Sequence, residues 1–162
     1  MGLKEIWDEY ENRRGYLQAL CNKFGDFKVA TTFPDKTWSR HVSVLEAWQN
    51  REYWRLDRAT HRQIFPNELV LDIDHDVKNT LTFSLKYLEK LGLSGYEVFA
   101  TGSKGYHVHL LFGKELTREE KIMFLYISGA DPLKSSSNVM IALEFAPHWK
   151  SGKVKEVLKC LS

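Results

Sequence analysis

The alternation of apolar and polar residues divides the chain into two differently patterned parts. In residues 3–24 the apolar positions fall near one helical stripe, and Gly25 follows as a stop signal, which predicts a long helix. Residues 27–33 alternate as a strand does and end at Pro34. Residues 40–60 are mixed, and their apolar positions fit one or two helices.

The second part of the chain is patterned more regularly. It predicts strands over residues 69–74, 96–100, 106–112 and 139–145, a helix over 78–91, and a second helix that begins at the capping box Thr117–Glu120. This order of elements is the split βαβ, ferredoxin-like arrangement. We therefore expect an α+β protein, in which an N-terminal αβ module (1–67) packs on an RRM-like module (68–162).

The composition is that of an ordinary globular domain. The 162 residues are 43% apolar and 13% aromatic, and no apolar run reaches the ~18 residues of a membrane helix. The first residues lack the apolar core of a signal peptide, and the two cysteines lie at opposite ends of the chain. We expect a cytoplasmic protein without a membrane partner.

The net charge is only +2, so the distribution of charge along the chain is more informative than its sum. Six basic residues face three acids in 36–62, and four lysines face one acid from residue 145 onward. Between these segments lies an acidic cluster, Asp72–Asp76. A negative centre between positive segments suits a metal site beside phosphate-binding surfaces, although scattered solvated charge is the alternative.

Two acids close the most apolar strand. Asp72 and Asp74 are two residues apart, so a strand places both on one face and Ile73 on the other. Two such carboxylates repel each other unless a divalent cation lies between them, and Mg²⁺ or Mn²⁺ takes oxygen ligands of this kind. The alternatives are a strand end with solvated acids and a turn in which Asp74 and Asp76 act as caps.

A glycine-rich turn follows about thirty residues later. Gly102 and Gly105 allow backbone amides to approach phosphate oxygens, and the turn also supplies hydroxyl, ammonium and imidazole groups. The candidate nucleotide-binding residues of this turn are Thr101, Ser103, Lys104, Gly105 and His107. A hairpin turn followed by a core histidine would have the same composition.

Later residues supply weaker candidates. Glu144 is the only acid in the run 138–145, and its strand could lie beside the one that carries the aspartates, or it could be an edge acid facing water. Lys150 and Lys153 follow in a basic turn. An arginine- and tryptophan-rich segment suits a single nucleic-acid strand, although most of its aromatics would be core residues; its candidates are Arg51, Trp54, Arg55 and Arg58.

The Asp-x-Asp strand and the turn Thr101–His107 resemble the motifs of the archaeo-eukaryotic primase superfamily. The resemblance implies a primase- or polymerase-type nucleotidyltransferase that uses nucleoside triphosphates on a single-stranded DNA or RNA template, with an accessory subunit or fused domain in some members. It implies a two-metal site (Mg²⁺ or Mn²⁺) held by Asp72, Asp74 and Glu144. The zinc-binding element common in the family has no cysteine set here.

Two other interpretations remain open. The run Tyr106–Leu111 also looks like the His-hydrophobe-His strand of HUH endonucleases, with His107 and His109 as metal ligands and Tyr126 as the nucleophile. The third possibility is a primase-like module that binds nucleotide or single strands without catalysis.

Overall fold

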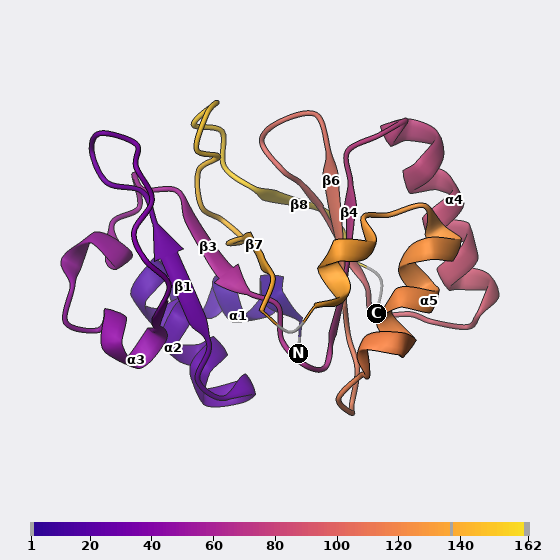
Figure 1. The fold of residues 1–162 in the computed structure, drawn as a ribbon, viewed down its shortest axis with the longest axis horizontal. Helices are drawn as coiled ribbons and strands as arrows, with labels where there is room; N and C mark the ends of the chain where they lie inside the picture. The colour runs from indigo at the N-terminus through magenta and orange to yellow at the C-terminus, as the bar shows by residue number, and fades with distance from the viewer. Residues whose placement is uncertain (1, 137, 161–162) are drawn as a thin grey trace.

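The computed structural model describes residues 2–136 and 138–160 and contains two four-stranded antiparallel sheets, each flanked by helices (Figure 1). The expected α+β class is confirmed. The first sheet has the order β2-β1-β3-β7, with β1 Lys28–Thr31, β2 Val42–Ser43, β3 Thr60–Gln63 and β7 Met140–Ala142. The second has the order β4-β6-β5-β8, with β4 Glu68–Ile73, β5 Glu97–Ala100, β6 Tyr106–Leu111 and β8 Glu156–Cys160.

The N-terminal helix is broken in two, which the single predicted helix over 3–24 missed. Helix α1 (Leu3–Tyr10) ends at Glu11, whose backbone is left-handed with φ 52°. Helix α2 (Arg13–Phe24) starts again because the Asn12 side chain accepts a hydrogen bond from the backbone N–H of Gly15 at 2.7 Å. The predicted stop at Gly25 is confirmed. The mixed segment that follows forms α3 (Val44–Ala47) and the 3₁₀ helix η1 (Arg51–Trp54).

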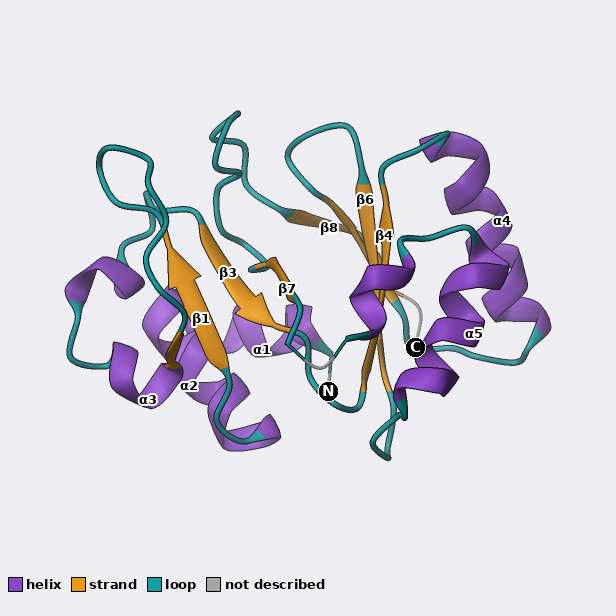
Figure 2. Cartoon of the chain, viewed as in Figure 1, coloured by secondary structure: helices purple, strands orange, loops and turns teal. Residues whose placement is uncertain are grey.

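Helices α4 (Val77–Lys90) and α5 (Arg118–Ser128) cover the outer face of the second sheet, away from the first (Figure 2). The 3₁₀ helix η2 (Pro132–Ser135) follows α5. Leu71, Ile73 and Val108 pack in this layer against Leu88 and Leu125. Because strand side chains alternate, the residues between them on β4 and β6 face the first sheet. None of the helices in the described part of the chain is long and apolar enough to span a lipid bilayer.

The last predicted strand, 139–145, is the main departure from the expected topology. Only Met140–Ala142 form a strand, and this strand pairs with β3 of the first sheet rather than with β4. The strand stops because the chain turns at Phe145, whose φ is 63°. The fourth strand of the second sheet is β8, which pairs with β5. The expectation that the strand of Glu144 lies beside the strand of the two aspartates is therefore wrong.

Both sheets share one interior with the N-terminal helices. The carboxylate of Glu97 on β5 accepts hydrogen bonds from the backbone N–H groups of Leu3 (2.6 Å) and Lys4 (2.9 Å), which have no partners within α1. An apolar cluster joins α2, the first sheet and the second sheet through Tyr16, Phe65 and Phe99. These contacts fix the relative position of the sheets, and the candidate site lies between them.

Candidate functional site

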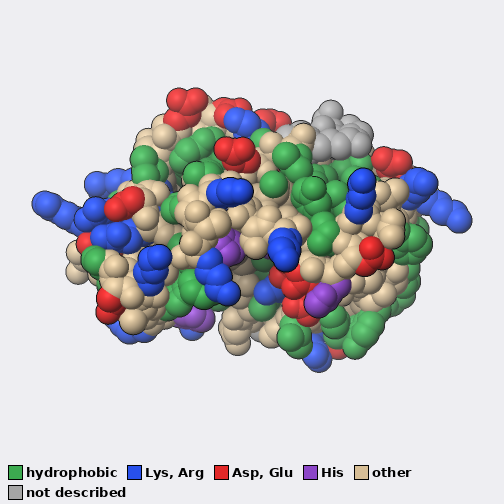
Figure 3. All heavy atoms as spheres, turned by 90° about the horizontal axis from the view of Figure 1, so that it is seen from above, with side chains coloured by type: hydrophobic (Ala, Val, Ile, Leu, Met, Phe, Trp, Pro, Cys, Tyr) green, Lys and Arg blue, Asp and Glu red, His purple; other side chains and the backbone are tan. Residues whose placement is uncertain are grey.

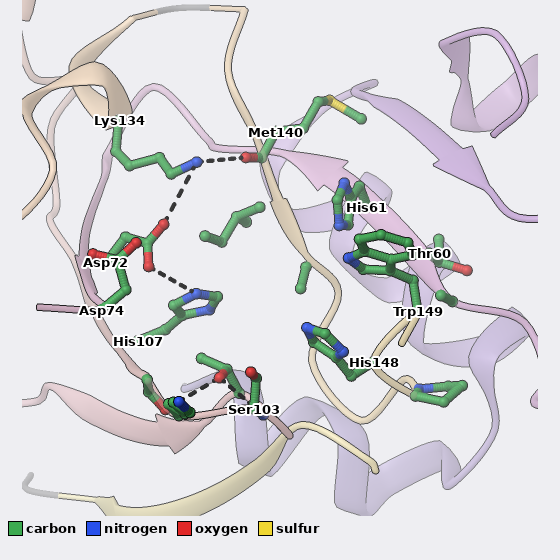
Figure 4. A pocket seen from close by; sticks show the side chains of 17 residues that line it. Thr60, His61, Asp72, Asp74, Ser103, His107, Lys134, Met140, His148 and Trp149 are labelled. Atoms are coloured by element: carbon green, nitrogen blue, oxygen red, sulfur yellow. Dashed lines mark hydrogen bonds and ion pairs between the residues drawn. The ribbon is translucent and has the colours of Figure 1, made fainter. Parts of the chain in front are cut away.

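A cavity of about 420 Å³ opens between the two sheets (Figure 4). Residues of β3 and β7 line one side, and residues of β4, β6 and the β5–β6 turn line the other. Seven of the residues predicted from the sequence are in its wall. They are Asp72, Asp74, Thr101, Ser103, Lys104, Gly105 and His107.

Asp72 and His107 are brought together by strand pairing. They are directly opposite each other in the antiparallel register of β4 and β6. The Nε2 atom of His107 lies 3.3 Å from Oδ1 of Asp72. Asp74 is two residues further on and lies on the same side of the cavity, whereas Ile73 is buried in the layer beneath α4 and α5 (Figure 4). The carboxylate pair and the imidazole therefore face one cavity.

Asp72 is ionised at neutral pH. Burial alone would raise the pKa of its carboxyl group, but the hydrogen bond from His107 and the positive charge of Lys134 lower it below the usual value. The Nζ atom of Lys134 lies 3.6 Å from Oδ2 of Asp72. Asp74 is exposed, and its Oδ1 lies 3.6 Å from Nε2 of His75. The aspartates thus present two carboxylates, one held in place and one open to solvent.

His107 is neutral at physiological pH. Burial and the charge of Lys155 lower its pKa to about 3, against the opposing effect of Asp72. Its Nδ1 atom is buried and has no hydrogen-bond partner among the described residues. With Nε2–H directed to Asp72, the neutral imidazole keeps only an acceptor at Nδ1, and it does not contribute positive charge to a phosphate group.

The turn from Thr101 to Gly105 is held by its own hydrogen bonds. The backbone N–H and the hydroxyl of Thr101 both donate to the carbonyl of Gly105, at 3.2 and 3.1 Å. Gly105 cannot be replaced by a larger residue without movement, because a Cβ atom there would lie 2.5 Å from the carbonyl oxygen of Ile73. Ser103 and Lys104 are exposed at the tip. The turn thus presents a hydroxyl and an ammonium group at the cavity rim.

A second turn, residues 147–153, packs directly on the first. Gly102 has φ 82°, and a Cβ atom there would lie 2.4 Å from the carbonyl oxygen of Lys153. The hydroxyl of Ser151 donates to the carbonyl of Gly102 at 2.6 Å. Of the predicted lysines in this region, neither Lys150 nor Lys153 lines the cavity, whereas His148 and Trp149 do.

An adjoining groove of about 340 Å³ shares Pro147, His148 and Trp149 with the cavity. Lys36, Arg58 and Lys150 also line this groove. Trp149 is 42% exposed, and the Nζ atom of Lys150 lies 4.7 Å from the centre of its ring. The face of the molecule seen from above carries Lys and Arg side chains spread over both halves, with histidines visible among them (Figure 3). An exposed indole beside cations suits a single nucleic-acid strand.

Glu144 does not lie in the cavity wall. Its carboxylate is fully buried and accepts hydrogen bonds from Nε of Arg62 (2.9 Å), the hydroxyl of Tyr16 (2.9 Å) and Nζ of Lys155 (3.1 Å). Burial would raise the pKa of Glu144, but Arg62 and Lys155 lower it to about 2. A carboxylate enclosed by these partners is not available as a cation ligand. The β7 residues that do line the cavity, Met140–Ala142, carry no carboxylate.

The remaining predicted contact residues lie outside the cavity. Trp54 packs edge-on against Trp48 and beside Arg14. Arg55 pairs with Asp57 at 3.0 Å. Arg58 pairs with Glu52 and Asp57, at 3.0 and 3.4 Å, and reaches only the adjoining groove. Arg51 is exposed on η1.

The endonuclease interpretation does not fit this geometry. Both ring nitrogens of His109 are engaged, Nδ1 with Glu68 at 2.8 Å and Nε2 with Lys155 at 3.0 Å. Tyr126 is exposed on α5, which covers the opposite face of the sheet from His107. Tyr126 therefore does not face the histidines, and both nitrogens of His109 already have partners.

The titratable cavity residues His61 and Lys134 were not predicted from the sequence. His61 alternates with buried residues along β3, and its ring packs on Trp38 with centres 4.3 Å apart and planes tilted by 32°. Lys134 is on η2 and reaches Asp72 only because η2 packs against β4. The alternation of β3 could have pointed to His61, but nothing local to residue 134 indicates its position.

Similar solved structures show which class of fold the chain has. No profile of a known protein family and no curated protein matches the sequence. Among solved structures, the primase-polymerase (PrimPol) AEP domain of cyanophage S-2L matches with a TM-score of 0.63 at 15% identity, over 92% of this chain and 89% of that one. The catalytic domain of primase RepB′ in complex with initiator DNA matches with a TM-score of 0.56 at 14% identity, over 91% and 85%.

A third structure has the same arrangement. The polymerase domain of Mycobacterium tuberculosis ligase D in complex with DNA matches with a TM-score of 0.59 at 12% identity, covering 97% of this chain and 80% of that one. The chain therefore has the fold of archaeo-eukaryotic primase-polymerase domains, as the resemblance in its motifs implied. At these identities the likeness establishes the fold, and the activity rests on the site.

Proposed function

We propose that the protein is a metal-dependent nucleotidyltransferase of the primase–polymerase type, which joins nucleotides to a primer on a single-stranded template. The observation that carries this proposal is the single cavity into which the Asp72/Asp74 pair and the Thr101–His107 turn both project. The fold is that of domains that include polymerases, and two of the similar structures are complexes with DNA.

The carboxylates fit one divalent cation that is shared with a phosphate chain. Asp72 and Asp74 lie on one side of the cavity, and Mg²⁺ in nucleotide sites is commonly held by one or two carboxylates together with phosphate and water oxygens. The described residues contain no cluster of three or more metal-binding side chains. A second cation of the expected two-metal site would therefore depend on the nucleic acid and the triphosphate for most of its ligands.

The turn fits the triphosphate. Ser103 offers a hydroxyl, Lys104 a positive charge, and the glycines let the backbone approach closely. His107 uses its single N–H, on Nε2, toward Oδ1 of Asp72 and so holds that carboxylate in one orientation. Asp72 and Asp74 would hold a cation that neutralises charge on the phosphates while the primer hydroxyl attacks the α-phosphate and pyrophosphate leaves. The role of the protein residues is to place the reacting groups and balance their charge.

The test is template-dependent incorporation of labelled ribo- and deoxynucleotides. We expect the wild-type protein to extend a primer in Mg²⁺ or Mn²⁺, and the double variant Asp72→Ala/Asp74→Ala to lose this activity while it keeps its thermal stability. Lys114→Ala, a change on an exposed side chain far from the cavity, is the matched control. Equal incorporation by the double variant would refute the proposed function.

The second candidate is a module of this fold that binds nucleotide and single strands without catalysis. The observation in its favour is that Glu144 is enclosed by Arg62 and Lys155, while the β7 residues in the cavity wall carry no carboxylate. Metal-dependent nucleotide binding without incorporation under any cation would select this candidate over the enzyme.

A further inference from the structure

Lys134 is held beside Asp72 by the backbone around it. A backbone hydrogen bond connects the start of the 3₁₀ helix η2 to Asp72. The N–H of Asp131, the residue before η2, donates to the Asp72 carbonyl at 3.3 Å. The Asp131 side chain caps η2 by accepting from the N–H of Leu133 at 3.0 Å. The buried hydroxyl of Ser135 donates to the Pro132 carbonyl at 2.7 Å. The position of Lys134 is thus built into the same strand end that carries the candidate metal ligands.

The ammonium group of Lys134 points into the cavity (Figure 4). It lies 3.6 Å from Oδ2 of Asp72 and donates to the Met140 carbonyl at 3.4 Å, and its side chain is only 18% exposed. Because His107 faces the other oxygen of Asp72, both carboxylate oxygens already have a positive or hydrogen-bonding neighbour. A divalent cation that binds Asp72 must therefore compete with Lys134.

We propose that Lys134 is a built-in counter-ion of Asp72 that suppresses cation binding until a triphosphate arrives. This inference rests on the proposed function of the same cavity. A triphosphate brings several negative charges into reach of the ammonium group, which can then leave Asp72 for a phosphate oxygen. The freed carboxylate oxygen is then available to the cation.

The consequence is positive coupling between cation and nucleotide. In the wild-type protein each ligand raises the affinity for the other, and linkage requires that the two factors be equal. Removal of the ammonium group removes the competitor, so the cation binds without waiting for the nucleotide. The coupling between cation and nucleotide then falls, because the nucleotide no longer has an ammonium group to draw away from Asp72.

The experiment measures Mn²⁺ affinity by electron paramagnetic resonance, with and without a non-hydrolysable nucleoside triphosphate, on intact protein. Lys134→Met keeps the length and apolar contacts of the side chain and removes its charge. We expect this variant to bind Mn²⁺ about tenfold more tightly than wild type when no nucleotide is present, and to show a smaller gain when nucleotide is added. Lys114→Met, on an exposed lysine that pairs with Glu120, is the control and should match wild type.

The outcomes separate this inference from the proposed function. Unchanged or weaker Mn²⁺ binding by Lys134→Met, with wild type still binding Mn²⁺ and nucleotide, would overturn the role of Lys134 alone. No Mn²⁺ binding by either protein, even with nucleotide, would overturn both. Adding Asp72→Asn to Lys134→Met should abolish the gain, and persistence of the gain in that double variant would place the cation elsewhere and also overturn the inference.

Discussion

The guanidinium group of Arg62 on β3 and the carboxylate of Glu68 on β4 form a two-armed ion pair, with both hydrogen bonds at 2.8 Å, that ties the two sheets together. It is part of a closed ring of buried charged groups. Glu68 contacts His109, His109 contacts Lys155, Lys155 contacts Glu144, and Glu144 returns to Arg62. The ring lies next to the cavity, because His109 is two residues from His107 on β6.

Removing Arg62 should destabilise the protein strongly. Arg62→Met leaves Glu68 and Glu144 buried with less counter-charge, and breaking a buried pair from one side costs about 3–5 kcal/mol. The free energy of unfolding in urea measures this loss. The exposed pair of Arg40 and Glu46 provides the control, because Arg40→Met should cost less than about 1 kcal/mol. Similar small losses for both variants would show that the ring does not hold the sheets together.

Stability should fall in weak acid, partly through His61. Burial and the charge of Lys134 lower the pKa of His61 to about 4, whereas a histidine in an unfolded chain titrates near 6.5. Between these values the unfolded chain binds a proton that the folded protein does not, so the free energy of unfolding decreases as the pH falls from about 6.5 towards 4. Above about 6.5 this effect of His61 is absent.

The variant His61→Phe isolates this contribution. It keeps a ring against Trp38 and removes the titrating group. The loss of stability between pH 7 and pH 5, measured by urea unfolding at each pH, should be smaller than in wild type by about 1–2 kcal/mol. His75→Phe changes an exposed histidine and should leave the wild-type pH profile. An unchanged slope in His61→Phe would contradict the assignment.

Single-stranded DNA should bind along the groove that contains Trp149. Its exposed indole can stack on a base, and stacking is worth about 1–3 kcal/mol per base, so Trp149→Ala should weaken binding by about 5- to 150-fold. Fluorescence anisotropy with a labelled oligonucleotide at fixed salt gives the affinities. Tyr126→Ala removes an exposed aromatic on the opposite side of the second sheet and should have no effect. Equal effects of the two substitutions would place the strand elsewhere.

The strand that carries the aspartates could be predicted because its information is local. Alternation placed Asp72 and Asp74 on one face and Ile73 on the other, and the structure has Ile73 in the outer layer. The capping box at Thr117 and the helix stop at Gly25 are also local signals, and both predictions are confirmed. The break between α1 and α2 was not predicted, because the apolar positions before and after Asn12 fall near one helical stripe.

The surroundings of Glu144 and Lys134 could not be predicted, because they depend on long-range pairing. β7 has three residues, and its own pattern does not tell whether it joins β3 or β4. The partners of Glu144 come from α2, β3 and the segment before β8, so an acid that seemed free in the sequence is enclosed in the fold. Lys134 reaches Asp72 because η2 packs against β4, and no pattern in the sequence around Lys134 predicts this contact.

The most direct test of the proposed function is a crystal structure with Mn²⁺ and a non-hydrolysable nucleoside triphosphate, with the metal located by its anomalous scattering. We expect a Mn²⁺ peak shared by Asp72, Asp74 and a phosphate oxygen, with the phosphate chain against the turn of Ser103 and Lys104. A metal bound away from both aspartates, or a triphosphate bound outside the cavity between the sheets, would contradict it.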